Sequence, residues 1–260
     1  MRATGFRPPA PGPLGLGGIM SNALAMFRAA PLALIVVALV STLPVALLAT
    51  AGDITYGPAE GSTEQALRAL VQLVPVLLLG PISTAATTVL AIDMLHGRPT
   101  GASRALEPVG ERFWPMAAVV VLATAGFILG LAALVVPGIV VLVLWLFAAQ
   151  VAVVERRGVR ESFARSVALV RGAFWWTFGS FLAVSLTVGL AAALLASVLS
   201  VAAVPLSGDA ELAGVGLATL IASTVIQPVG NLGLALIFLE RRMRREGAWP
   251  DPVITAADRA

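Results

Sequence analysis

The sequence predicts an all-α integral membrane protein with about six transmembrane helices. Of its 260 residues, 58% are hydrophobic and only 12% are charged, which is too few charges to cover a soluble globule of this size. The charged residues are also unevenly spaced and leave five charge-free windows, each longer than the roughly twenty residues needed to cross the hydrocarbon of a bilayer. The segments between the windows alternate between arginine-rich and acidic, as the loops on two sides of a membrane do.

The five windows contain six predicted spans. The longest window, residues 113–154, is too long for one crossing, and Pro137-Gly138 is expected to divide it into a helical hairpin. The predicted spans are residues 31–51, 69–92, 115–136, 138–154, 175–203 and 212–239.

The spans define one membrane domain, residues 17–246, between two tails. The Pro/Gly-rich residues 1–16 and residues 247–260 are expected to be flexible. Ala49-Thr50-Ala51 resembles a signal-peptidase site, but the thirty residues before the apolar run are longer than the start of a signal peptide. A first spanning helix that is kinked at Pro44 is therefore the preferred interpretation.

The distribution of arginine predicts the orientation. All 17 basic residues are arginines, and every one except Arg68 falls in the two terminal segments or in the second and fourth loops. By the positive-inside rule, both termini are expected in the cytoplasm. The alanine-rich, lysine-free composition is typical of a GC-rich bacterial genome, so the expected location is a bacterial inner membrane. The net charge of +3 is ordinary for such loops and does not indicate nucleic-acid binding.

A short amphipathic stretch precedes each odd-numbered span and ends in an arginine; the similar segments of the three stretches start at Ser21, Ser103 and Ser162. In the third, apolar residues from Val159 to Val170 share one helical face and arginines occupy the other, which is typical of a helix in the membrane interface with its apolar side among acyl chains. The pattern predicts three repeated units of interfacial helix plus helical hairpin. Chance similarity among alanine-rich stretches is the alternative.

Arginines in and beside these stretches are the candidate contacts for anionic lipid headgroups or for a partner protein: Arg112, Arg157, Arg160, Arg165 and Arg171. Membrane lipids and a protein are the expected partners, with no nucleic acid and no cofactor. The oligomeric state is left open by the sequence. Gly126-x-x-x-Gly130 permits close helix packing either within the protein or between copies.

Three amides lie within predicted spans, namely Gln150, Gln227 and Asn231. A polar group in lipid must find a partner, so these side chains are expected to form interhelical hydrogen bonds or to line a cavity. Pro228 also frees a backbone carbonyl near the middle of the last span, which makes a broken-helix substrate site the sharper alternative. No ionisable residue lies deep in a span, which argues against proton-coupled transport. With no cysteine and one histidine, His96, a site built from these ligands is not expected.

The segment from Trp145 onward carries a recognisable pattern, which comprises Trp145, Phe147-Ala148, Val154-Glu155, Gly158, Glu161-Ser162, Arg165-Ser166, Leu169 to Gly172 and Trp176. Gly80-Pro81-Ile82, Gly97-Arg98 and the run from Glu240 to Gly247 extend it over about residues 17–247. The pattern resembles the membrane domain family associated with glycerophosphoryl diester phosphodiesterases. In fused members, a separate soluble domain carries the catalysis with a histidine, carboxylates and a divalent metal. No segment here resembles that domain, so the resemblance implies no catalytic activity.

These observations favour a non-catalytic polytopic inner-membrane protein. Its expected role is that of a membrane scaffold or regulatory domain that contacts anionic lipid or a partner protein through a cytoplasmic arginine-rich face. The alternative is a small transporter or permease component with a midspan site near Gln227 to Asn231. An intramembrane enzyme is a third possibility, but no embedded catalytic pair is visible in the sequence.

Overall fold

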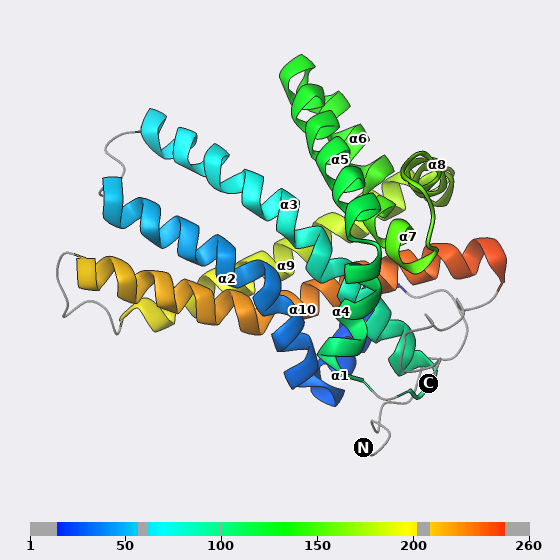
Figure 1. The fold of residues 1–260 in the computed structure, drawn as a ribbon, viewed down its shortest axis with the longest axis horizontal. Coiled ribbons are helices and arrows are strands. Elements are labelled where there is room, and N and C mark those ends of the chain that lie inside the picture. The colour runs from blue at the N-terminus through cyan, green and yellow to red at the C-terminus, as the bar shows by residue number, and fades with distance from the viewer. Residues whose placement is uncertain (1–14, 57–61, 99, 202–208, 248–260) are drawn as a thin grey trace.

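The structure is a computed structural model that describes residues 15–56, 62–98, 100–201 and 209–247. Within these ranges all regular structure is helical, as Figure 1 shows. The tails predicted for residues 1–16 and 247–260 lie outside the described residues except for their inner ends: the first helix begins at Leu16 and the last ends at Glu246.

The described helices follow one another in three units of the same order, each a short helix followed by a helical hairpin. The first unit comprises α1 (Leu16–Ala29), α2 (Pro31–Tyr56) and α3 (Ser62–Leu95). The second comprises α4 (Ala102–Glu111), α5 (Phe113–Ala133), α6 (Val135–Trp145) and α7 (Ala148–Val154). The third comprises α8 (Val159–Val170), α9 (Phe174–Ser200) and α10 (Asp209–Glu246). The predicted element order of three repeated units is confirmed.

Six stretches of the described chain are long and apolar enough to cross a membrane: Pro31–Leu48, Pro75–Leu95, Phe113–Ala133, Val135–Val154, Phe174–Ser200 and Ala213–Glu246. Their number and order agree with the six predicted spans. Large apolar side chains on the outer faces of these helices are exposed, among them Leu186, Leu190 and Leu194 of α9. Such a surface suits a lipid environment, and the fold is that of an all-α polytopic membrane protein.

The turn between the third and fourth spans lies before the predicted Pro137-Gly138 pair. Helix α5 ends at Ala133, Leu134 is extended with φ −170° and ψ 151°, and α6 begins at Val135. Pro137 therefore sits in the first turn of α6. The N–H groups of a first turn have no partner within the helix, so a proline is tolerated there and does not break the chain's helical path.

The α5–α6 hairpin is closely packed because glycines line its seam. A Cβ atom on Gly130 would lie 2.7 Å from the Cα atom of Gly138, and a Cβ atom on Gly126 would collide with the Trp145 ring. Both glycines of the Gly126-x-x-x-Gly130 pattern thus face the neighbouring helix of the same chain, so this pattern allows close packing within the protein.

The fourth span is interrupted between α6 and α7, and a serine from α8 bonds to the backbone there. The Ser166 hydroxyl accepts a hydrogen bond from the Phe147 N–H at 3.2 Å and donates one to the Leu144 carbonyl at 2.8 Å. Backbone groups at a break in lipid require such partners. The second helices of the other two hairpins contain prolines, Pro75 and Pro81 in α3 and Pro228 in α10.

Helices α2, α3, α9 and α10 form one bundle, and the α5–α6 hairpin diverges from it toward its tip (Figure 1). The core lies where α3 contacts both α7 and α10. Leu90, Phe147 and Phe238 are fully buried there, and the two phenylalanine rings have centroids 5.7 Å apart.

The apolar face of α8 is covered by protein, whereas the sequence predicted that it would lie among acyl chains. Val159 and Phe163 pack on a cluster of Val119, Ala148 and Ala152, and the Phe163 and Trp145 rings have centroids 4.7 Å apart. Helical periodicity shows that one face is apolar but does not show what covers it.

Candidate functional site

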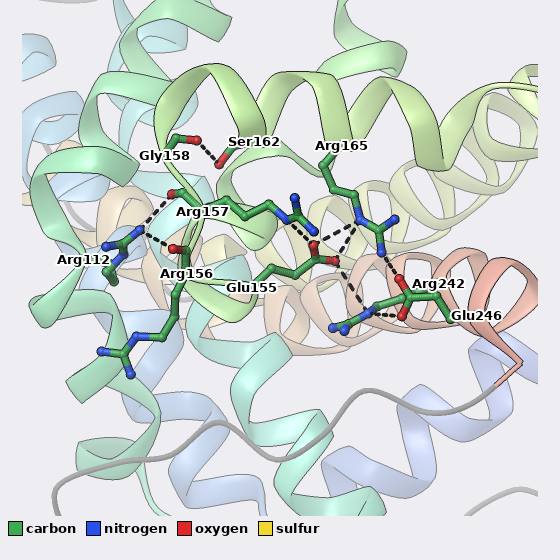
Figure 2. A network of polar contacts seen from close by, with 9 residues as sticks. All are labelled: Arg112, Glu155, Arg156, Arg157, Gly158, Ser162, Arg165, Arg242 and Glu246. Carbon is green, nitrogen blue, oxygen red and sulfur yellow. Dashed lines mark hydrogen bonds and ion pairs between the residues drawn. The ribbon is translucent and has the colours of Figure 1, made fainter.

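Glu155 is the centre of an ionic network that joins α7, α8 and α10 (Figure 2). Its side chain is only 4% exposed and lies 2.8 Å from Arg157 Nε, 3.0 Å from Arg165 Nε and 3.6 Å from Arg242 Nε. Glu246 of α10 pairs with both Arg165 and Arg242. Several charge-assisted contacts on one carboxylate offset the free energy of removing it from water.

Three of the five predicted lipid-contact arginines bond within the protein. Arg157 and Arg165 pair with Glu155, as described above. Arg112, which lies between α4 and α5, donates to the carbonyls of Arg156 and Arg157 at 2.6 and 2.8 Å (Figure 2). These side chains hold the connections between the short helices and the spans together.

The other two predicted arginines are accessible. Arg160 lies in the first turn of α8 and Arg171 directly follows its last residue, and both are exposed. Neither guanidinium forms a hydrogen bond or an ion pair with the described part of the chain, although the Arg171 carbonyl accepts a bond from Arg245. The structure therefore does not gather the five arginines into one accessible patch.

A buried carboxylate recurs toward the end of the second helix of every hairpin; an arginine-paired carboxylate was expected at Asp93, but its recurrence was not predicted from the sequence. Asp93 of α3 pairs with Arg104 of α4 at 3.0 Å, Glu155 pairs with Arg165 of α8, and Glu240 pairs with Arg244 of the same helix at 2.8 Å. A signal was present, because each of these residues is the first acidic residue after a charge-free window. Pro81 and Pro228 also precede Asp93 and Glu240 by the same interval of twelve residues.

A cavity of about 530 Å³ lies between α3, α5, α6, α7, α9 and α10. Most of the residues that line it are apolar, including Phe127, Trp145 and Phe181. All three predicted intramembrane amides, Gln150, Gln227 and Asn231, line this one cavity. Among the described residues of its wall, none is charged.

Hydrogen bonds on successive turns of α3 hold two of the amides in place. Asn231 Nδ2 donates to Ser83 Oγ at 2.8 Å, and Thr84 Oγ1 donates to Asn231 Oδ1 at 3.2 Å. One turn further along α3, Gln150 Nε2 donates to Thr88 Oγ1 at 3.3 Å. The predicted interhelical hydrogen bonds are thus present for Gln150 and Asn231. We call Ser83, Thr84, Thr88, Gln150 and Asn231 the polar ladder.

Two polar groups of the cavity wall have unused hydrogen-bonding capacity. The Gln150 side chain is 1% exposed, and its Oε1 atom has no hydrogen-bond partner in the described chain. Gln227 is half-buried, and its carboxamide forms no hydrogen bond with any described residue. A buried acceptor without a partner costs about 1–3 kcal/mol, so such groups call for an explanation.

The fold and the cavity define a class: the chain is a polytopic, all-α membrane protein with an uncharged cavity among its spans. In the described residues no cluster of three or more histidine or carboxylate side chains is placed to hold a metal ion. Comparison of the chain with protein-family models, with curated proteins and with solved structures gives no match.

Proposed function

We propose that this is a non-catalytic inner-membrane protein, with both termini in the cytoplasm, that binds an amphipathic molecule in the cavity, as a small transporter or permease component does. The observation that carries the proposal is the cavity itself. It combines mostly apolar walls with a few polar groups, two of which lack partners, and its volume lies in the range of small-molecule sites.

The shape of the fold supports entry from the bilayer. The α5–α6 hairpin diverges from the bundle (Figure 1), and both helices contribute to the cavity wall together with α9. Exposed leucines and valines cover the outer faces of α5 and α9, so lipid borders these helices. A molecule dissolved in the membrane would therefore meet an uncharged surface at the helices that line the cavity.

A matched pair of substitutions on α5 tests this function. Ala123 lines the cavity, whereas Ala125 on the same helix is exposed and does not line it. The tagged protein is purified in mild detergent, and co-purifying small molecules are quantified by mass spectrometry. Ala123→Phe is expected to reduce the amount of a specific bound amphiphile about tenfold, because overpacking by an added ring costs about 1–3 kcal/mol.

Ala125→Phe is the control and should retain the bound molecule at the wild-type level. Equal retention by both variants, or the absence of any enriched amphiphile from the wild-type protein, would contradict the proposed function.

The scaffold function predicted from the sequence remains a second candidate. It is favoured by the exposed, unpaired guanidinium groups of Arg160 and Arg171 at the two ends of α8. Such groups are free to contact anionic headgroups or an acidic partner. The resemblance to the membrane domain associated with glycerophosphoryl diester phosphodiesterases is compatible with either candidate and stays a prediction.

Replacing Arg160 and Arg171 together by glutamine is expected to weaken binding of phosphatidylglycerol about 30-fold. This estimate assumes about 1 kcal/mol for each basic residue near an anionic surface. Binding is measured by native mass spectrometry of protein released from nanodiscs. The double lysine variant keeps the charge and should bind as the wild type does; unchanged binding by the glutamine variant would exclude this contact.

A further inference from the structure

The Gln150 carboxamide has a defined orientation in the cavity wall. The Thr88 hydroxyl donates its proton to the Thr84 carbonyl at 2.8 Å, so it can only accept toward Gln150. Gln150 must therefore present its Nε2 donor to Thr88. Its Oε1 atom is the end without a partner, which leaves a buried acceptor that requires a donor.

Gln227 is the second amide in the cavity wall with unused hydrogen-bonding groups. Its carboxamide carries two N–H donors and an acceptor oxygen, none of which bonds to the described chain. Asn231, one turn further along α10, differs because its Nδ2 donates to Ser83 Oγ and its Oδ1 lies 3.2 Å from Thr84 Oγ1, whose proton it shares with the Gly80 carbonyl. Gln150 and Gln227 are thus the amides available to a ligand, and Asn231 positions the helices around it.

The residues that line the cavity indicate whether its ligand is charged. None of the described lining residues is charged, so an ionised headgroup would enter a region of low dielectric constant without a counter-ion. The aromatic rings of Phe127, Trp145 and Phe181 and the surrounding aliphatic side chains suit a hydrocarbon chain. A phospholipid headgroup, a fatty-acid carboxylate and an inorganic ion all lack a matching partner here.

We propose that the ligand is a neutral lipid-like molecule with a hydrocarbon chain and free hydroxyl groups, one of which bonds to Gln150 and another to Gln227. This inference rests on the proposed binding function. Each hydroxyl has one donor and two lone pairs, so one can donate to the Gln150 oxygen and another can bond to the Gln227 amide. An ester without a hydroxyl provides acceptors only and leaves Gln150 Oε1 unsatisfied.

Trp145 provides a local readout because it lines the cavity. A variant that retains Trp145 and carries phenylalanine in place of Trp114, Trp175, Trp176 and Trp249 is reconstituted in nanodiscs. Three probes share one brominated oleoyl chain, which quenches tryptophan fluorescence on contact: the monoacylglycerol, the methyl ester and the free fatty acid. Saturable quenching by the monoacylglycerol is expected at a concentration about tenfold below that of the methyl ester, since only the monoacylglycerol has a donor for the otherwise unsatisfied Gln150 oxygen.

Gln150→Met together with Gln227→Met removes the polar groups and keeps side-chain length. This double variant should still show saturable quenching by the methyl ester, which shows that the cavity is intact, and should lose the tenfold preference for the monoacylglycerol. Equal quenching by the two neutral probes, or tightest binding of the fatty acid, would overturn the inference while leaving the binding function in place. Absence of saturable quenching by every probe would overturn both.

Discussion

Replacing Glu155 by glutamine is expected to destabilise the protein by about 3 kcal/mol, because the buried carboxylate that pairs with three arginines is lost and Arg165 and Arg242 then share the charge of Glu246. Arg165 is only 18% exposed and Arg242 equally so, and each would lose its pairing with Glu155. The network joins three helices of two units, so its loss should loosen α8 from α7 and α10. The change is measured by unfolding of purified wild-type and variant protein in the same detergent.

Glu161→Gln is the matched control for Glu155. Glu161 lies in the first turn of α8, is exposed and forms no ion pair within the described chain. Its substitution should cost no more than about 0.5 kcal/mol, which is the contribution of an exposed carboxylate at a helix N-terminus. Equal destabilisation by the two substitutions would show that the network contributes nothing beyond net charge.

The second large effect is expected for Gly130→Ala, which should destabilise the protein by about 2 kcal/mol. The added methyl group would lie 2.7 Å from the Cα atom of Gly138, and backbone there can yield only if the α5–α6 hairpin opens. The change is again measured by unfolding of purified wild-type and variant protein in the same detergent.

Gly179→Ala in α9 is the control, because nothing lies within 4 Å of a Cβ atom built at that position. Alanine there should be neutral or stabilising by up to about 1 kcal/mol. A Gly130→Ala protein that kept its stability but changed its oligomeric state would show instead that the glycine pattern acts between copies.

The six spans and the three-unit order could be predicted because lipid imposes a simple rule: apolar stretches of sufficient length cross, and charges mark the loops. The turn of the second hairpin was misplaced by a few residues, since Pro137 is compatible with a first helical turn. The break before α7 carried no visible signal, because it depends on a hydroxyl from Ser166, far along the chain.

The candidate site was predicted only in part, for a different physical reason. Charge spacing identified Arg112 and Arg165 as interfacial but could not show that carbonyl groups and buried carboxylates engage them. The polar character of Gln150, Gln227 and Asn231 was evident, and two of the three form the expected interhelical bonds. That all three side chains line one cavity was not evident from the sequence, because six helices from all three units build the cavity wall.

The recurring carboxylate affects the order in which the units of the chain are joined during translation. Asp93 meets Arg104 of α4 eleven residues later, and Glu155 meets Arg165 of α8 ten residues later, so each of the first two hairpins gains an ion pair to the next short helix only when that helix has left the ribosome. Glu240 instead pairs four residues along its own helix. Successive units are therefore joined in the direction of translation, and each new short helix secures the hairpin made before it.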